Sequence, residues 1–298
     1  MSTRTLTTVL GTYPHTRALK DGSVTSPDIT LAFQEVTPVH KAFAPMVRKE
    51  AYDVCELAIV TALQAVVYDR PVVLLPIVVA SRFQRGCLIS YRPRGVVQPD
   101  DLAGKRIGVR AYTQTTGMWV RSHLMEDFGL DIAAVDWLTH DGAHVEQYAD
   151  PAFVRHDDSD KGLVSMLRDG DIDAAILGND LPKGEEFVPV IEDADTRDLA
   201  WWRTHGFMPI NHMVAAASGA CERDPGSIRA AYELLRESAS RASANPDGPV
   251  PFRFGFESLR QPVEFTIDAC MRQGLLPRRP SVDEVFAPAR RILGPAGD

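Results

Sequence analysis

Apolar and polar residues alternate in short blocks along the first part of the chain, and the period changes from block to block. Residues 5–10 and 29–35 alternate with a period of two, which predicts strands with one buried face. Residues 39–49 carry apolar side chains three and four positions apart, which predicts an amphipathic helix. A third strand opens at residues 52–54, and the apolar run 71–80 has the length of one buried strand. This order predicts an α/β protein whose mixed, mostly parallel sheets carry helices on both faces.

The middle of the chain repeats part of this design. Residues 161–168 predict a helix that runs into a strand at 170–176. Residues 48–54 have the same helix-to-strand layout, with an arginine and an aspartate five positions apart in both copies. The repeat favours two lobes of similar design.

The chain returns to its first lobe near residues 207–214, and two helices are predicted after this crossing, at 227–242 and 261–272. Two lobes joined by two crossings leave a cleft between them, which is a common place for small ligands. We therefore expect a two-lobed protein with a ligand cleft between the lobes. The expected lobes are 1–80 plus 210–298, and 81–209.

A strand, a loop and a capped helix follow one another in the expected second lobe. Residues 106–109 predict a short strand, and Thr115 or Thr116 is a suitable N-cap for a helix that Gly129 closes. The first N–H groups of such a helix have no internal partner, so this arrangement can bind an anion. A plain helix cap without a ligand is the alternative.

Composition restricts the partners of the chain. Its 298 residues carry a formal net charge of -8 and no basic stripe, which argues against nucleic-acid binding. No segment reaches the ~20 apolar residues that span a bilayer, so no membrane partner is expected. The N-terminal residues do not resemble a signal peptide, and we expect a cytoplasmic protein if the chain is complete. The four cysteines form no C-x-x-C pair and predict no metal site, and self-association into a homo-oligomer stays open.

Several short phrases, in the same order over nearly the whole chain, are shared with one enzyme family. They are Asp53-Val-Cys-Glu-Leu57, Ser81-Arg82 with Arg85, Asp101-Leu-Ala-Gly-Lys-Arg-Ile-Gly-Val109, Tyr112, Thr115, Trp119-Val-Arg121, Pro209-Ile-Asn-His212 and Gln273-Gly-Leu275. Together they resemble the 4,5-dihydroxyphthalate decarboxylase family. The resemblance implies a type-two periplasmic-binding-protein fold and a decarboxylase, a carboxy-lyase, that acts on a hydroxylated aromatic carboxylic acid. We expect no cofactor and no metal.

The chain departs from that family at two places. Its members carry Arg-His where this chain has Arg85-Gly86, and Pro-Glu-Tyr where it has Arg110-Ala111-Tyr112. Two alternatives therefore stay open beside a dihydroxyphthalate-like decarboxylase. One is a non-catalytic solute-binding protein for a small aromatic carboxylate, and the other is an enzyme of the same fold with an altered substrate.

Three arginines lie at or just after predicted strand ends. A guanidinium holds a carboxylate with two parallel hydrogen bonds and keeps its charge when partly buried. Arg82, Arg85 and Arg110 are therefore candidates to bind the substrate carboxylate, and a solvated surface role is the alternative for each. The other substrate-binding candidates are Tyr13, Tyr112, Thr115 and Thr116.

Two residues are candidates for proton transfer, which decarboxylation of a hydroxylated ring requires at the carbon that carries the carboxyl group. Glu56 lies in an apolar stretch, where it either pairs as structural support or exchanges protons through a raised pKa. His212 lies on the returning strand, where a satisfied core histidine is the alternative. His140 and His144 have metal-like spacing, but Gly142 between them predicts a loop.

Overall fold

The computed structural model of the protein describes residues 3–178, 180–242 and 248–298. The chain forms two compact units. Unit 1 comprises the residues up to Arg82 together with Ile210–Asp268 and Leu276–Asp298, and unit 2 comprises Phe83–Pro209 and Ala269–Leu275. The sequence assigned this last segment to the first lobe. It lies in unit 2 because the side chain of Gln273 is hydrogen-bonded to Met118 and Arg121.

Unit 1 is built on a mixed six-stranded sheet in the order β12-β4-β11-β3-β1-β2. The strands β1 to β4 run parallel to one another, while β11 and β12 run antiparallel to them. The strand β11 therefore begins at the edge of the sheet where β1 to β4 end. The bounds are β1 (Arg4–Val9), β2 (Ile29–Phe33), β3 (Val54–Ala58), β4 (Val72–Ser81), β11 (Ile210–Ala217) and β12 (Arg253–Phe254).

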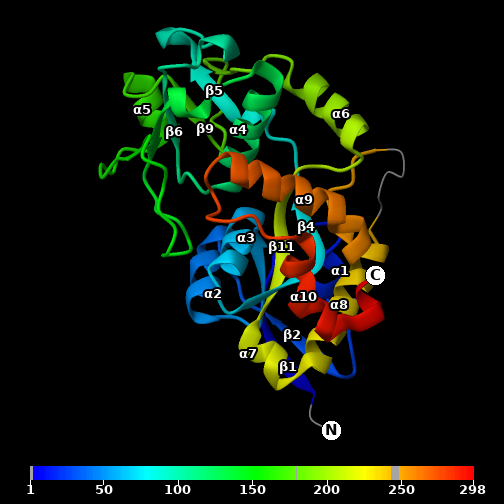
Figure 1. Cartoon of the computed structure of the whole chain (residues 1–298). Helices are drawn as coiled ribbons and strands as arrows, with labels where there is room; N and C mark the ends of the chain where they lie inside the picture. The colour runs from blue at the N-terminus through cyan, green and yellow to red at the C-terminus, as the bar shows by residue number, and fades with distance from the viewer. Residues whose placement is uncertain (1–2, 179, 243–247) are drawn as a thin grey trace. The chain divides into compact units, whose positions relative to one another are not determined.

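Helices cover both faces of this sheet, as the sequence predicted. Figure 1 shows α2 and α3 on one side and α1, α8 and α10 on the other. A right-handed crossover explains this division, because the chain moves across the sheet in one direction through α2 and α3 and in the opposite direction through α1. The bounds are α1 (Arg17–Lys20), α2 (Phe43–Lys49), α3 (Ile59–Val67), α7 (Ser218–Arg223), α8 (Pro225–Ser240), α9 (Phe256–Arg272) and α10 (Val282–Leu293).

The helix α9 begins five residues earlier than the sequence predicted. The prediction began the helix next to Pro262, since proline is favoured in a first helical turn. In the structure Pro262 lies inside the helix, and Phe256 and Leu259 of the preceding turn are buried in the core. Burial of these two side chains extends the helix despite the proline.

Unit 2 repeats the design with a second six-stranded sheet, in the order β10-β5-β9-β6-β7-β8. Its core contains Ile89 of the sheet, Met166 and Leu167 of helix α5, and Ile172, which lies between α5 and β9. The strands are β5 (Leu88–Tyr91), β6 (Arg106–Val109), β7 (Asp136–Thr139), β8 (Val154–His156), β9 (Ala174–Ile176) and β10 (Phe187–Pro189), and the helices are α4 (Thr115–Phe128), α5 (Leu163–Asp169) and α6 (Ala194–His205). Short 3₁₀ helices in the two units are η1 (Val39–Ala42), η2 (Arg85–Cys87), η3 (Arg92–Arg94), η4 (Pro99–Asp101), η5 (Ile132–Ala134) and η6 (Gly294–Gly297).

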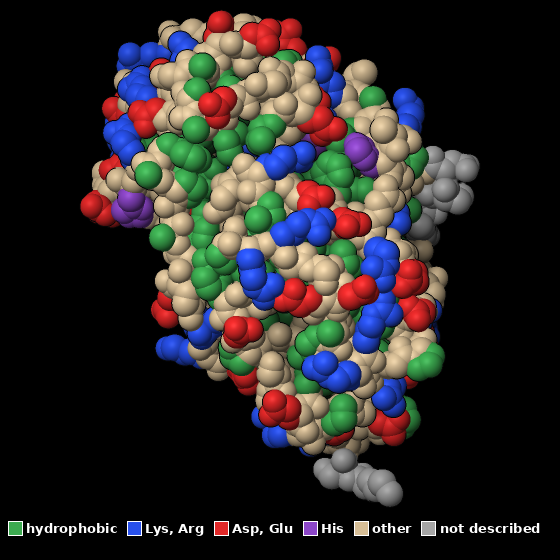
Figure 2. Space-filling view, in the orientation of Figure 1, with side chains coloured by type: hydrophobic (Ala, Val, Ile, Leu, Met, Phe, Trp, Pro, Cys, Tyr) green, Lys and Arg blue, Asp and Glu red, His purple; other side chains and the backbone are tan. Residues whose placement is uncertain are grey.

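Charged side chains of both signs are interspersed on the face shown in Figure 2. On α9 and α10 some of them form ion pairs, such as Arg260 with Asp283 at 2.8 Å. This face therefore carries no extended patch of a single sign. Within the described part of the chain, no helix combines the length and the apolar character that a membrane crossing requires.

The end of α4 gives a test of the local backbone. Gly129 follows the helix in the left-handed conformation with φ of 65°, which an L side chain adopts at a cost. We expect Gly129→Ala to lower the free energy of unfolding by about 1 kcal/mol. Gly142→Ala is the control, since Gly142 lies in a loop with open space around its Cα. Urea unfolding followed by circular dichroism measures both, and equal midpoints would contradict the assignment.

Candidate functional site

One edge of the unit 1 sheet gathers several of the residues that the sequence singled out. The strands β1, β3 and β4 end at this edge and β11 begins there. Residues 10–16 follow β1, Arg82 follows β4, and His212 lies near the start of β11. Ligands of open α/β sheets commonly bind beyond the carboxyl ends of the strands. We call this edge the carboxyl edge.

Glu56 and His212 meet because of the register between β3 and β11. Glu56 pairs with Val214, and Ala58 pairs with His212. Residues two positions apart on a strand share one face, so Glu56 and His212 are diagonal neighbours on the same face of the sheet. His212 Nδ1 lies 2.5 Å from Glu56 Oε1.

The Glu56 carboxylate accepts three hydrogen bonds. The Tyr13 hydroxyl donates to Oε1 at 2.5 Å, and His212 Nδ1 donates to the same oxygen. The backbone N–H of Gly11 donates to Oε2 at 2.7 Å. Glu56 is fully buried, so these three donors replace the water that the carboxylate loses on folding.

The hydrogen-bond donors around Glu56 determine which groups of this cluster are charged. Burial by itself would raise the pKa of Glu56, but His212, Tyr13 and Gly11 hold that pKa below its ordinary value. Burial and the neighbouring Glu56 carboxylate raise the pKa of the Tyr13 hydroxyl. Glu56 is therefore ionised and Tyr13 keeps its proton. An ionised carboxylate only accepts hydrogen bonds, so Nδ1 of His212 carries a proton.

Nε2 is the ring nitrogen of His212 that does not contact Glu56. The His212 side chain is 21% exposed, and the edge of its ring packs against Phe43 at 5.2 Å between centroids. Among the described residues, none is hydrogen-bonded to Nε2. The sequence allowed direct proton exchange by Glu56 through a raised pKa. In the structure Glu56 has no exposed surface and a lowered pKa and is hydrogen-bonded to His212, which favours the other alternative, a paired supporting carboxylate.

The loop after β1 is a packed support for Glu56. Tyr13 covers Gly11 so closely that a Cβ on Gly11 would lie 2.7 Å from the tyrosine ring. The Tyr13 ring also stacks on His15 at 5.3 Å, and His15 Nε2 lies 2.9 Å from the carbonyl oxygen of Val79. Tyr13 was predicted to bind substrate, but its hydroxyl proton is committed to Glu56. Gly11 was missed because it acts through its backbone N–H, which no residue type signals.

Arg82 lies at the same edge. It is the first residue after β4 and is partly buried. Burial raises the pKa of Tyr13, and the positive charge of Arg82 opposes part of that rise. Unit 1 alone therefore brings together Arg82, Tyr13 and the Glu56–His212 pair.

Arg85 has a different role from the one that the sequence predicted. Its side chain is only 2% exposed and makes two hydrogen bonds to Asp127, at 2.7 and 3.0 Å. A third hydrogen bond, of 2.6 Å, joins it to Asp198. The buried Asp198 and the partly buried Asp127 thus occupy this guanidinium, so Arg85 supports unit 2 and does not present a free face to a substrate carboxylate. The sequence could not show this, because Asp127 and Asp198 are 42 and 113 residues away.

The other candidates in unit 2 lie around the start of α4. Gln114 is the N-cap, and Thr115 and Thr116 are the first two helical residues, so the predicted cap was one or two residues late. Tyr112 is buried, and its hydroxyl donates to the carbonyl oxygen of Gln273 at 3.2 Å, which turns it away from a ligand. Arg110 remains partly exposed and lies 3.2 Å from Asp141.

The histidines with metal-like spacing do not form a metal cluster. His140 Nε2 lies 3.8 Å from Asp157 Oδ2, as a loose pair. Within residues 3–178, 180–242 and 248–298, no group of three or more His, Cys, Asp and Glu side chains is close enough to hold a metal ion.

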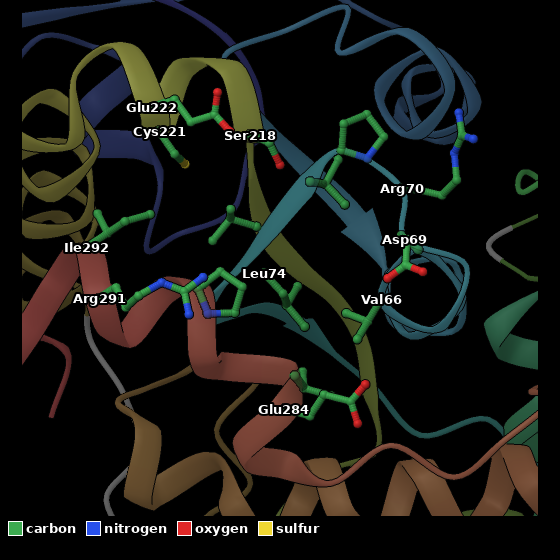
Figure 3. Close-up of a pocket in the computed structure, with 16 residues that line it drawn as sticks. Val66, Asp69, Arg70, Leu74, Ser218, Cys221, Glu222, Glu284, Arg291 and Ile292 are labelled. Carbon is green, nitrogen blue, oxygen red and sulfur yellow. The ribbon is translucent and has the colours of Figure 1, made fainter.

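A cavity of about 540 Å³ lies in unit 1 at the opposite edge of the sheet, where β4 begins (Figure 3). Leu74 and Ile292 contribute apolar walls, and Glu222 and Arg291 lie around it. It is about 20 Å from the carboxyl edge along β4, at 3.3 Å per residue. We place the chemistry at the carboxyl edge, because the hydrogen-bonded acid–base pair is there.

Removal of Arg85 should destabilise the protein. Arg85→Ala leaves the buried Asp198 and the partly buried Asp127 without their cation, and we expect a loss of about 3–5 kcal/mol in the free energy of unfolding. Arg92→Ala is the matched control, since Arg92 is exposed in the same unit. Urea unfolding compares the two variants. A loss in Arg85→Ala no larger than in the control would contradict the structural role.

The Glu56 cluster should make stability depend on pH. The folded-state pKa of Glu56 is below its unfolded value of about 4.3, so the cluster stabilises the fold above that pH and loses its contribution as the pH falls through the folded pKa. We expect the stability gap between the wild type and Glu56→Gln to be largest near pH 7 and to shrink in acid. Glu233→Gln, an exposed position on α8, is the control in thermal unfolding from pH 7 to 3. A gap that is constant over this range would count against an ionised Glu56.

Two curated proteins are similar to this chain in sequence. No protein-family model matches the chain. A 4,5-dihydroxyphthalate decarboxylase of Comamonas testosteroni is 27% identical over 249 residues, which cover 78% of this chain and 75% of that protein. A protein of the same name from Pseudomonas putida is 29% identical over 186 residues, which cover 59% and 71% of the two chains.

Solved structures show the fold. The periplasmic aliphatic sulphonate binding protein SsuA of Escherichia coli superposes with a TM-score of 0.60 at 11% identity, over 96% of this chain and all of that one. The desulfurization enzyme DSZB superposes with a TM-score of 0.53 at 16% identity, over 97% and 99% of the two chains. Both sequence and fold therefore agree with the resemblance: the chain is similar in sequence to two proteins named 4,5-dihydroxyphthalate decarboxylase and has the periplasmic-binding-protein fold.

Proposed function

We propose that the protein is a carboxy-lyase that releases CO₂ from a hydroxylated aromatic carboxylic acid of the dihydroxyphthalate type, without a cofactor. The observation that carries this proposal is the Glu56–His212 pair, a buried carboxylate that holds a partly exposed imidazole at the carboxyl edge. The names of the two curated relatives support the same reaction.

The proposed reaction needs a proton at a ring carbon. Direct loss of CO₂ would leave an aryl carbanion, which is too costly. In the proposed route the ring hydroxyl loses its proton and pushes electrons into the ring, while an acid protonates the carbon that bears the carboxylate. The bond to the carboxylate carbon then breaks, CO₂ departs, and its electron pair restores the aromatic ring as a phenolate, which takes a proton back. One proton is consumed for each CO₂ released.

His212 is the proposed proton carrier. Its Nδ1–H is fixed on Glu56, so Nε2 faces outward with a defined orientation. The negative Glu56 stabilises the imidazolium that forms when Nε2 takes up a proton, and Tyr13 and Gly11 keep that carboxylate ionised. Glu56 is thus a positioning residue, and His212 is the residue that touches the substrate. A placed acid or base of this kind contributes about 10²–10⁴-fold in rate.

Arg82 is the proposed anchor for the substrate carboxylate. It lies at the same edge as His212, and its guanidinium matches the planar geometry of a carboxylate. Orientation of the carboxylate relative to Nε2 is the part of catalysis that such an anchor supplies.

A solute-binding protein is the second candidate. Arg82 and the fold would suffice to capture a small aromatic carboxylate, and SsuA of Escherichia coli is by name a binding protein. The glycine at position 86 and the alanine at 111 favour it, because family members carry His and Glu there. Ligand binding without any CO₂ release distinguishes this function from the first.

Substitution of the pair tests the enzyme directly. We expect His212→Asn and Glu56→Gln to bind 4,5-dihydroxyphthalate while CO₂ release falls by about 10²–10⁴-fold. His156→Asn is the control, since His156 is exposed on β8 of unit 2. Calorimetry measures binding, and trapped CO₂ measures turnover.

Two results would contradict the proposal. One is a wild-type protein that binds hydroxybenzoates and phthalates tightly and releases CO₂ from none of them, which would favour the solute-binding function. The other is loss of turnover in EDTA, because a metal would then supply the electrophile in place of arginine.

The anchor has its own test. We expect Arg82→Ala to weaken binding of the aromatic acid by about 2–5 kcal/mol, as for the loss of one partner of a desolvated charge pair. Arg82→Lys should restore only part of this, because a point charge cannot form two parallel hydrogen bonds. Arg110→Ala tests the loop of unit 2 separately. Unchanged affinity in Arg82→Ala would remove this residue from the site.

A further inference from the structure

The cavity at the opposite edge of the unit 1 sheet has no part in the proposed reaction. We call it the distal pocket. It measures about 540 Å³, which is within the range of small-molecule pockets, and it lies about 20 Å from the carboxyl edge along β4. Its lining comes from the end of α3, the beginning of β4 and the helices α7 and α10, so it is built within unit 1 alone.

An apolar wall runs through the middle of the distal pocket. Leu74 of β4 and Val285 of α10 are buried, and Val66 of α3 is partly exposed. Val73 and Ile292 extend this wall, and among the described residues no aromatic side chain lines the pocket. Removal of an aliphatic chain from water against such a wall is favourable. The wall therefore suits the apolar part of a ligand.

Charges of opposite sign stand at the two ends of the apolar wall. Glu284 and Arg291 lie seven positions apart on α10, which places them on one face and about 10 Å apart along the helix axis. Figure 3 shows Arg291 on one side of the pocket and Asp69 and Glu284 on the other side. In the same view Leu74 and Val66 lie between the two sides. One end of the distal pocket can therefore attract an anion, and the other end repels it.

Arg291 is the available cation of the distal pocket. Within the described part of the chain, its guanidinium makes no ion pair and no hydrogen bond. The other arginine of the lining, Arg70, donates to the carbonyl oxygens of Val47 at 3.1 Å and Arg48 at 3.4 Å, at the end of α2. Because Arg291 is exposed, it contributes modestly to affinity and mainly orients a bound carboxylate.

Acidic side chains limit the ligand to one carboxylate. Both oxygens of Glu284 accept hydrogen bonds from Arg278, whereas Asp69 and Glu222 are exposed. A second carboxylate at the far end of an aliphatic chain would lie on the side of Asp69. It would also lose water against the apolar wall without a donor to replace that water. A ligand with a single carboxylate avoids both penalties.

We propose that the distal pocket binds an aliphatic monocarboxylate of medium chain length, with its carboxylate on Arg291 and its chain along the apolar wall. The inference goes beyond the proposed function, because the ligand class is different and the carboxyl edge contributes no residue to this pocket. It does not depend on whether the protein releases CO₂.

Calorimetry with octanoate and octanedioate, acids of equal length with one carboxylate and with two, tests the ligand class. We expect the wild type to bind octanoate, and to bind octanedioate at least about tenfold more weakly. Asp69→Asn removes the negative charge at the far end, and asparagine tolerates the left-handed backbone of this position, with φ of 51°. This variant should narrow the difference between the two acids. Equal affinity of the wild type for both acids would contradict the proposal.

Arg291→Gln tests the anchor of the carboxylate. We expect octanoate to bind about three- to tenfold more weakly, as for loss of a partly exposed charge-assisted contact. Arg290→Gln is the matched control on the same helix, since Arg290 is paired with Glu257 at 3.2 Å and does not line the pocket. Glu222→Gln should act in the opposite direction, because its charge opposes a bound anion. An affinity in Arg291→Gln equal to that in Arg290→Gln would remove the anchor.

Val66→Phe tests the apolar wall. The larger side chain fills part of the distal pocket, so octanoate binding should be lost, and thermal unfolding checks that the fold is retained. If this variant does not fold, Arg291→Gln decides by itself.

Arg82→Ala locates the bound acid. Loss of octanoate in Arg82→Ala, together with wild-type affinity in Arg291→Gln, would place the acid at the carboxyl edge and make the proposal wrong. A wild type that does not bind octanoate would also overturn it.

Discussion

The burial of one negative charge organises the carboxyl edge of unit 1. Glu56 lies in a strand whose other side chains are apolar and buried, and a carboxylate there is tolerable only when donors replace its water. The three donors come from a backbone N–H, a tyrosine and a histidine on two other parts of the sheet. Each donor is thereby fixed relative to the others. The hydrogen bonds that stabilise the buried Glu56 carboxylate also hold His212 in one orientation. The same contacts therefore serve the stability of the fold and the proposed proton transfer.

Unit 2 also contains a buried charge, that of Arg85, but this charge is paired with carboxylates. Arg85 is as deeply buried as Glu56, but its partners are themselves carboxylates, the buried Asp198 and the partly buried Asp127, and they occupy its guanidinium. In unit 1 the last member of the chain of hydrogen bonds, His212, keeps a partly exposed ring with Nε2 available. The difference between structural support and a candidate site is thus the exposure of the terminal group.

A binding protein and a decarboxylase must both hold a carboxylate, but only the decarboxylase also needs a proton donor. In the proposed function the first requirement is met by Arg82, and the second by His212 with its buried carboxylate Glu56. Few changes would separate the two functions on this fold. This is why the discriminating measurement is proton-dependent CO₂ release and not affinity.

The sequence by itself determined the alternation of strands and helices, the end of α4 at Gly129, and the identities of Glu56, His212 and Arg82 as candidates, because periodicity, glycine conformation and residue chemistry are local properties. Only the tertiary structure determined which of these residues are in contact. Glu56 and His212 are 156 residues apart, and only the antiparallel register of β3 and β11 makes them diagonal neighbours. The same holds for Arg85, which was predicted to bind the substrate but is paired with two distant carboxylates, and for Gly11, whose role depends on its backbone N–H. Hydrogen bonds and cavities form between segments that the chain brings together in space, so no local pattern of residues can encode them.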